Sequence, residues 1–148
     1  MTGVQTCALP IYALLERCGL SAIFELAEKL DVALLSVGGI TALTTSYRTG
    51  DITEADRRSL IDAGAVGDVL YNFIDRNGAL VPHEVNDRVI SVNLKHLRRT
   101  PERVLISGGK DKIVALRAAI TTLSPTTLIT DEQTARSLAS DDTRVPEV

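Results

Sequence analysis

The sequence predicts an α/β protein with a mainly parallel sheet, and two observations lead to that fold class. Residues 32–37 and 103–107 form short apolar runs with little polar alternation, which is typical of parallel strands buried on both faces. Both runs end in a pair of glycines, and the second is followed by residues with helical spacing and then by another short apolar run. This strand–helix–strand order predicts a right-handed crossover within a parallel sheet.

The composition of the 148 residues fits one globular domain and excludes other classes. Hydrophobic residues make up 45% of the chain and aromatic residues only 3%, so Leu, Ile, Val and Ala must build the core. The formal net charge is -3, whereas a nucleic-acid-binding domain shows a basic excess. The longest apolar run is far shorter than the roughly 20 residues of a transmembrane helix. We therefore expect neither DNA binding by this chain nor a membrane segment.

Motifs for metals and nucleophiles are lacking in the sequence. Cys7 and Cys18 are the only cysteines, and without a CxxC pair they are typical of reduced thiols in a cytoplasmic protein. His83 and His96 are isolated, and no serine or cysteine nucleophile is arranged around them in a known motif. We expect no metal site, no cofactor and a cytoplasmic location.

The two ends of the chain differ from the rest in character. Residues 1–11 have neither the basic start nor the long apolar run of a signal peptide, and their string VQTCALPI is similar to translated sequencing-adapter sequence. We interpret 1–11 as a non-native N-terminus, with a short native helix or loop as the alternative. Residues 12–139 are then the expected domain, and residues 140–148 are expected to be a frayed tail.

The first expected elements are a broken helix and a strand. Apolar residues within 13–30 follow helical spacing, with a break at Gly19 and Ser21 as the expected N-cap of the second piece. The run 32–37 follows as a strand, which its Gly-Gly pair ends.

The middle of the chain carries cap and turn signals. Residues 53–56 resemble a capping box, and the helix that they open is closed by Gly64. Residues 66–74 are expected to form one strand. The Asn-Gly turn within 75–78 predicts a hairpin with residues 79–81.

The last third of the chain gives the clearest α/β unit. Its central helix follows the 3.6-residue period of a packed face and stops before Pro125. The expected elements are a strand at 89–92, a helix at 94–98, a strand at 103–107, a helix at 111–123, a strand at 126–130 and a final helix through Leu138 that Asp131 caps.

The strongest candidate for chemistry is the turn Gly108-Gly109 between a buried strand and a helix. Glycines there let the backbone approach a ligand, and the amides and dipole of a helix N-terminus favour an anion. Lys112 in the first helical turn opposes the dipole by about 0.3–1 kcal/mol, which is easier to understand if a phosphate binds beside it. The alternative is an ordinary strand-to-helix turn with solvated lysines.

Two further residues are candidates for ligand contacts. Asp68 lies near the start of an apolar run, where its carboxylate would accept hydrogen bonds from sugar hydroxyls or merely cap a strand end. Arg48 lies in a polar stretch and would clamp a phosphate through two parallel hydrogen bonds, unless it is an ordinary surface arginine.

Five sequence blocks lie across residues 22–138: DVALLSVGGI, AGAVGDVLYNFIDRNG, NDRVISVNLKHLRR, RVLISGGKDK and LITDEQTARSL. Together they resemble the effector domain of SorC-type sugar-responsive transcriptional regulators. The resemblance implies a Rossmann-like three-layer sandwich, related to glucosamine-6-phosphate isomerases and deaminases, that binds a phosphorylated sugar. It also implies a homo-oligomer, dimer or tetramer, whose DNA affinity the ligand changes.

The resemblance assigns roles to the candidate residues. Gly108, Gly109 and Lys112 match the family's GGxxK, which implies part of the phosphosugar site. Asp68 matches the acidic position of the AVG[DE] block, which implies a sugar contact. Arg48 falls near a family arginine, although the loop length there varies.

This sequence also departs from the family pattern. Gly-Gly-Ile stands where the family has GIG, and neither the first half of the effector domain nor a helix-turn-helix is found. We therefore expect the C-terminal part of an effector domain with an exposed apolar sheet face or edge, whose DNA binding requires a missing helix-turn-helix. The alternative is a fragment of a sugar-phosphate isomerase or deaminase, with Asp68 as base but no evident acid–base partner.

Overall fold

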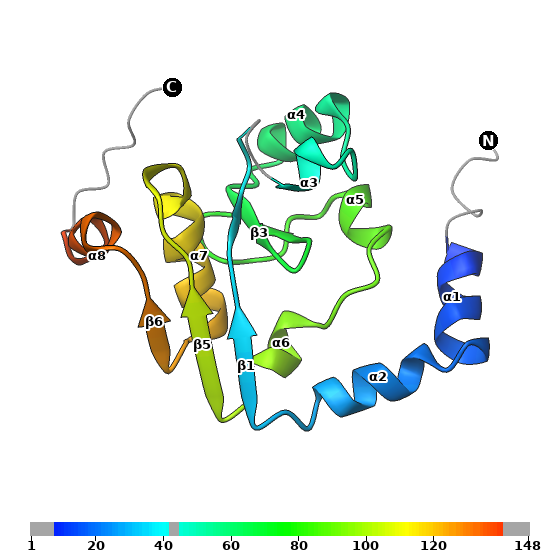
Figure 1. The fold of residues 1–148 in the computed structure, drawn as a ribbon. Coiled ribbons are helices and arrows are strands. Elements are labelled where there is room, and N and C mark those ends of the chain that lie inside the picture. Colours follow the sequence, from blue (N-terminus) through cyan, green and yellow to red (C-terminus); the bar gives the residue numbers. More distant parts are fainter. Residues whose placement is uncertain (1–7, 42–44, 141–148) are drawn as a thin grey trace.

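The structure, a computed structural model, describes residues 8–41 and 45–140 and contains two three-stranded sheets (Figure 1). The first is parallel, in the order β1-β5-β6, and the second is antiparallel, in the order β2-β3-β4. The strands are β1 (Val32–Leu35), β2 (Gly38–Gly39), β3 (Gly67–Val69), β4 (Asn72–Ile74), β5 (Glu102–Ile106) and β6 (Thr127–Ile129). The helices are α1 (Ala8–Arg17), α2 (Leu20–Ala27), α3 (Thr45–Arg48), α4 (Glu54–Asp62), α5 (Glu84–Asp87), α6 (Leu94–Leu97), the short 3-10 helix η1 (Lys110–Lys112), α7 (Ile113–Leu123) and α8 (Glu132–Ala139).

The parallel unit in the last third of the chain confirms the sequence prediction. Strand β5 pairs in parallel with both β1 and β6, and α7 connects β5 to β6. Asp131 caps α8, because its carboxylate accepts the N–H of Thr134 at 2.8 Å. One boundary differs: residues 110–112 form a 3-10 turn, so the α-helix begins at Ile113 rather than at Asp111.

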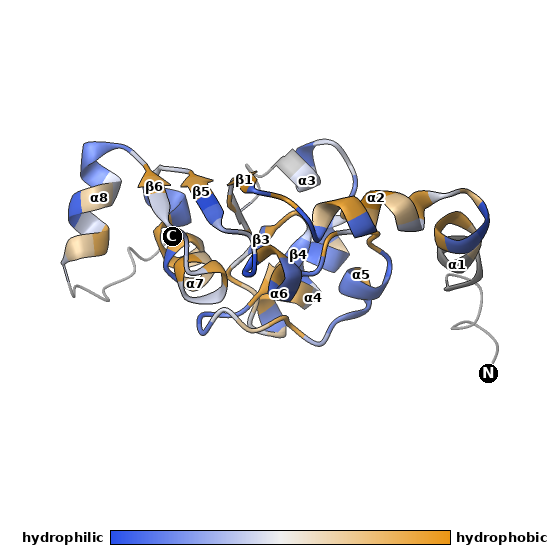
Figure 2. Ribbon diagram, turned by 90° about the horizontal axis from the view of Figure 1, so that it is seen from below, coloured by the Kyte–Doolittle hydropathy of each residue, from blue (hydrophilic) through white to orange (hydrophobic). Residues whose placement is uncertain are grey.

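The main core lies between the parallel sheet and α7. Leu35 and Leu105 of the sheet and Leu116 and Leu123 of α7 are buried in one cluster. Helix α7 also packs on β3 and β4, so the same helix supports both sheets (Figure 2). A second cluster, centred on Phe73, lies between the antiparallel sheet and α4.

The opposite face of the parallel sheet is exposed, which corrects the expectation that its strands are buried on both faces. Burial alternates along β1, so Val32 and Leu34 remain 51% and 69% exposed beside buried neighbours. Ile106 of β5 and Ile129 of β6 are 43% and 51% exposed. The expected exposed apolar face is therefore present in the part of the chain that the structure describes.

Helices α1 and α2 form an arm that extends away from both sheets (Figure 1). No residue of α2 is buried, and Ile23 and Leu26 are 58% and 66% exposed. The predicted N-cap at Ser21 is wrong. Gly19, in the left-handed conformation with φ 73°, is the N-cap, and Ser21 lies inside the helix.

The two chain ends are only partly covered by the structure. Helix α1 begins at Ala8, inside the segment 1–11 that we set apart as non-native, and residues 1–7 lie outside the described part. The expected tail likewise lies outside it, except for Ser140. No helix of the described residues is long and apolar enough to cross a membrane.

The antiparallel sheet was not predicted. Residues 66–74 form two strands, β3 and β4, instead of one, because Leu70 and Tyr71 adopt positive φ angles of 51° and 62° and reverse the chain. The Gly-Gly pair at 38–39 forms β2 instead of ending the strand structure, and it pairs with β3. Here tertiary pairing prevails over weak local strand preference.

The remaining middle segments match the sequence in part. The capping box at Thr53 and Asp56 is present. The turn after Asp75 has Gly78 at φ 78°, but the returning segment forms only an isolated bridge from Leu80 to Ile74 rather than a strand. The strand expected at 89–92 is irregular, whereas the helix expected at 94–98 is present as α6. Helices α3 and α5 were not predicted.

Candidate functional site

The Gly108-Gly109 turn lies directly after β5 and packs against the turn between β6 and α8. A Cβ atom on Gly108 would lie 2.3 Å from Oδ2 of Asp131, so any side chain at position 108 would displace this carboxylate. Gly109, at φ 110°, donates its N–H to Oγ1 of Thr134 at 3.0 Å and to Oδ2 of Asp131 at 3.2 Å. This amide is therefore occupied within the protein. The amide of Lys112 donates to the carbonyl of Gly109 at 3.1 Å, so a ligand would meet other amides of the first helical turn.

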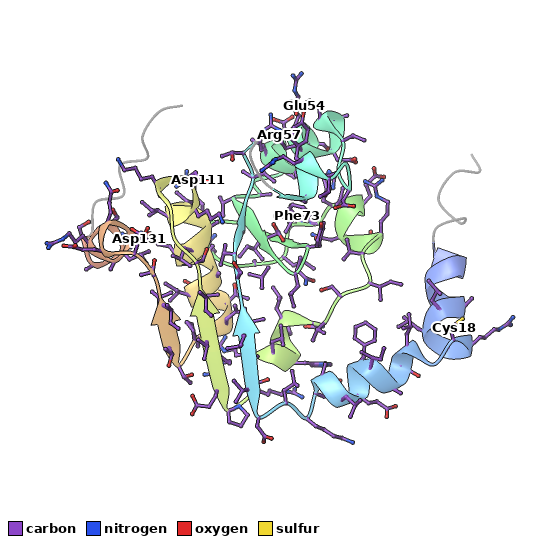
Figure 3. The ribbon with its side chains drawn as sticks, in the orientation of Figure 1. Cys18, Glu54, Arg57, Phe73, Asp111 and Asp131 are labelled. Atoms are coloured by element: carbon purple, nitrogen blue, oxygen red, sulfur yellow. The ribbon has the colours of Figure 1, made fainter. Side chains whose placement is uncertain are left out.

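Asp131 bridges the two turns at this edge of the parallel sheet, and Figure 3 shows it at the start of α8, near Asp111 of η1. Hydrogen bonds from Thr134, and then from the N–H of Gly109, lower the pKa of the Asp131 carboxyl. The carboxylate thus remains charged and holds the glycine turn in place. Its role is capping and fixation of the turn, in agreement with the capping expectation.

Asp68 is a buried carboxyl at the centre of the antiparallel sheet. Only 8% of the residue is exposed, and its Oδ2 accepts the N–H of Tyr71 at 2.9 Å. Burial raises the pKa of Asp68, while the N–H of Tyr71 and the positive charge of Lys112 act in the opposite direction. Among the described residues, the N–H of Tyr71 is the one hydrogen-bond donor to this carboxyl, which therefore has capacity to accept hydrogen bonds from a bound hydroxyl.

Lys112 ends η1 and is the N-cap residue of α7, where its side chain makes no capping hydrogen bond. The residue is partly buried, and its charge acts on Asp68. The structure thus brings together two residues that lie far apart in the sequence. When Asp68 is ionised, its negative charge attracts this cation and so opposes the unfavourable interaction of Lys112 with the helix dipole.

Gly38 lies beside Asp68 and η1 and was not predicted as a site residue. We call the place where Gly38, Asp68 and Lys112 meet the junction. It pairs with Asp68 across the antiparallel sheet, and β2 also packs beside η1. A Cβ atom on Gly38 would lie 2.1 Å from Oδ1 of Asp68, so the missing side chain makes room for the carboxylate. The available signal was the Gly-Gly pair, which we had interpreted only as a strand end.

Arg48 stands apart from this group. It is the exposed last residue of the short helix α3, and the described residues show no contact between it and Asp68 or Lys112. Four of the five predicted residues thus lie at the carboxyl end of β5 or at the adjacent antiparallel sheet, and Arg48 does not join them.

A cleft of about 320 Å³ lies beside Tyr71 of the β3–β4 turn. None of the five predicted residues lines it. Its walls combine the ring of Tyr71 with charged and aliphatic side chains: Asp51, Ile52, Val85, Arg88 and Val89. Arg88 is paired with Asp56 at 2.6 Å.

The chemistry of the junction suits an uncharged or anionic hydroxylated ligand better than a metal ion. Asp68 supplies a buried acceptor, Lys112 a cation, and α7 the amides of its first turn. Within residues 8–41 and 45–140, no cluster of three or more His, Cys, Asp or Glu residues is arranged to hold a metal. His83 instead caps α5 through the N–H of Val85, which it accepts at 3.2 Å.

Known proteins similar to this chain are regulators. The family described as "Putative sugar-binding domain" matches residues 11–140. The deoxyribonucleoside regulator of Bacillus subtilis (strain 168) is 33% identical over 119 residues, which cover 80% of this chain and 38% of the relative. The transcriptional regulator LsrR of Klebsiella pneumoniae is 32% identical over 115 residues, which cover 76% of this chain and 36% of the relative. The chain thus spans less than two fifths of either relative.

Solved structures agree with the fold. A DeoR family transcriptional regulator from Listeria monocytogenes superposes with a TM-score of 0.81 at 24% identity, over 86% of this chain and 51% of that chain. The full-length sorbitol operon regulator SorC from Klebsiella pneumoniae gives a TM-score of 0.77 at 21% identity, over 91% of this chain and 44% of that chain.

These comparisons do not favour the enzyme alternative, because the relatives are transcriptional regulators and not isomerases or deaminases. They agree with the resemblance that the five sequence blocks carry. Since the family match covers residues 11–140, the chain belongs to the sugar-binding domain family of SorC/DeoR-type transcriptional regulators.

Proposed function

We propose that the junction between the two sheets binds the effector of a sugar-responsive regulator, and that this effector is a phosphorylated sugar. The observation that carries the proposal is the buried carboxyl of Asp68 under the influence of Lys112, at the N-terminus of α7. Asp68 would accept sugar hydroxyls, and Lys112 with the first amides of α7 would bind the phosphate.

The other candidate residues have supporting roles in this proposal. Gly108 and Gly109 allow the close turn that places η1 and Lys112, since a Cβ atom on Gly108 would collide with Asp131. Arg48 stays a candidate phosphate ligand on the sequence alone, because the described residues show no contact between it and the junction.

Several properties of the whole protein are part of the same proposal. The relatives are longer than the matched region, and we propose that a helix-turn-helix elsewhere in the parent protein binds DNA, that the parent is a cytoplasmic homo-oligomer, and that residues 1–11 are not native. We also propose the relationship to the three-layer fold of glucosamine-6-phosphate isomerases. The exposed apolar face of the parallel sheet supports it, because a third layer would cover that face.

The test is a thermal-shift titration of the chain with pentose and hexose phosphates and with the corresponding free sugars. A ligand at about 100 times its dissociation constant adds roughly 2.7 kcal/mol of stability. Lys112→Ala removes a charge-assisted contact of about 1.5–3 kcal/mol, so the best phosphosugar should bind roughly ten- to a hundredfold more weakly. The matched control is Lys95→Ala, on the exposed surface of α6, which should bind as the unmodified chain does.

Two results would contradict the proposal. Equal binding of a phosphosugar to the chain and to Lys112→Ala would show that Lys112 does not contact the phosphate. A free sugar that binds as tightly as its phosphate would show that the junction does not recognise the phosphate group.

A further inference from the structure

The turn between β3 and β4 has an unusual backbone for its residues. Leu70 and Tyr71 both lie in the left-handed region, at φ 51° and 62°, as in a type I′ hairpin turn. Such turns normally contain Asn and Gly, because other side chains are strained at positive φ. Strain of this kind persists only where the surroundings hold it, and it is concentrated at functional sites.

The surroundings hold this turn through hydrogen bonds from several segments. The hydroxyl of Tyr71 donates to Oδ2 of Asp51 at 2.8 Å, which ties the strained residue to the segment before α4. Oγ of Ser91 donates to the carbonyl of Leu70 at 2.7 Å. On the inner side, the N–H of Tyr71 donates to Oδ2 of Asp68 at 2.9 Å. Tyr71 therefore connects the exposed carboxylate of Asp51 to the buried carboxyl of Asp68.

We propose that Tyr71 is a positioning residue for Asp68: the Tyr71–Asp51 hydrogen bond fixes the backbone that directs the Tyr71 N–H at the Asp68 carboxylate. This inference rests on the proposed function, in which Asp68 contacts the ligand. The carboxylate is confined on two sides, by the N–H of Tyr71 at Oδ2 and by the backbone of Gly38 at Oδ1. A ligand hydroxyl thus meets an acceptor that is already oriented.

A merely structural role would be served better by glycine. At position 71, glycine would adopt the observed φ without strain. The side chain present instead carries a hydroxyl that reaches Asp51 and a ring that lines the cleft. The charged group that faces Asp68 from the neighbouring η1 is Lys112, and the Tyr71 side chain itself lies toward Asp51.

The experiment follows the carboxyl carbon of Asp68 by ¹³C NMR during a pH titration, so it requires no ligand. Tyr71→Phe removes the hydrogen bond to Asp51 and keeps the ring. We expect the pKa of Asp68 to rise further, because the N–H that favours its charged form becomes less well placed. Tyr47→Phe is the matched control: the same atom is removed from a tyrosine of α3 whose ring lies 5.8 Å from the Arg57 guanidinium carbon, and Asp68 should titrate unchanged.

A second pair of variants separates positioning from a general loss of structure. Asp51→Asn keeps an oxygen that accepts the Tyr71 hydroxyl, so it should preserve the Asp68 titration. Asp51→Ala lacks an acceptor and should behave as Tyr71→Phe does. The proposal is overturned if Asp68 titrates identically in Tyr71→Phe and the unmodified chain, or if both Asp51 variants shift it equally.

Ligand binding is the second readout, with the phosphosugar panel described above. Tyr71→Phe should weaken the best phosphosugar roughly three- to tenfold, the range for one hydrogen bond. Equal affinity for both proteins would overturn the positioning role. If the NMR shift is observed and no phosphosugar binds any version, the positioning of Asp68 stands and the proposed function fails.

Discussion

The two sheets of this molecule are built on different principles. The parallel sheet consists of apolar strands whose ends are marked by glycine turns and helix caps close in sequence, as at Gly108 and Asp131. The antiparallel sheet consists of a Gly-Gly strand and a hairpin whose turn contains no typical turn residue. Local pattern therefore specifies the first sheet, and contacts between distant residues specify the second.

The candidate site lies where the two sheets meet. Lys112 comes from the helix that follows the parallel strand β5, and Asp68 comes from the antiparallel strand β3. Their interaction requires that α7 packs on β3, which it does. A ligand that bridges both residues would therefore stabilise the contact between the two sheets as well as its own binding mode.

The largest expected effect distinguishes the two faces of the parallel sheet. Leu35→Ala removes a side chain that is 6% exposed in the main core and should cost about 2–4 kcal/mol of unfolding free energy. Leu34→Ala, one residue earlier in β1, removes a side chain that is 69% exposed and should cost less than about 0.5 kcal/mol. Urea denaturation of both variants measures the difference. Similar losses would show that the second face is covered as well.

The apolar run by itself could not reveal which of its side chains are exposed. Residues 32–37 are apolar at nearly every position, and such a run does not say which face meets a covering layer. The β5–α7–β6 unit was predictable because its helical period, its glycine turn and its cap are all local signals. The hairpin was not, because Leu70 and Tyr71 have no preference for a turn and depend on Asp51, Asp68 and Ser91.

The same limit applies to the site. The Gly-Gly turn was recognisable from its place between strand and helix, and so was Lys112 as a cation opposing a helix dipole. That Asp68 lies within the influence of Lys112 follows from the packing of two sheets and cannot be read from spacing. The family resemblance implied both residues independently, whereas Gly38 and Tyr71 became visible only in the structure.

A smaller effect, of opposite sign, is expected at Asp68. Burial raises the pKa of its carboxyl above 3.8, so the charged form is disfavoured in the folded chain. The stability that the protonated carboxyl contributes is present below the unfolded pKa and is lost as the pH rises through the folded pKa. The asparagine of Asp68→Asn does not ionise, so the variant does not lose this stability as the pH rises. Its side-chain oxygen can still accept the N–H of Tyr71. The variant should gain about 1 kcal/mol at pH 7 and nothing at pH 3.

Thermal unfolding across this pH range checks the sign, and phosphosugar titration checks the function. The variant should be more stable than the unmodified chain at neutral pH and should bind the ligand more weakly. A loss of stability at pH 7 would show that the Asp68–Lys112 attraction outweighs the cost of burial. In that case this attraction between charges, and not apolar packing alone, would hold the two sheets together.

The smallest expected effect lies outside both sheets. Deletion of residues 1–11 shortens α1, which extends with α2 as an arm away from the body (Figure 1). The arm is tied to the body near its end, where Glu28 pairs with His96 at 2.8 Å, and the deletion leaves that pair intact. Because no residue of α2 is buried, the loss of the preceding turn should change the melting temperature by less than about 2 °C. A fall in melting temperature several times larger, measured by differential scanning calorimetry, would show that residues 1–11 pack natively. The arm would then unfold cooperatively with the two sheets.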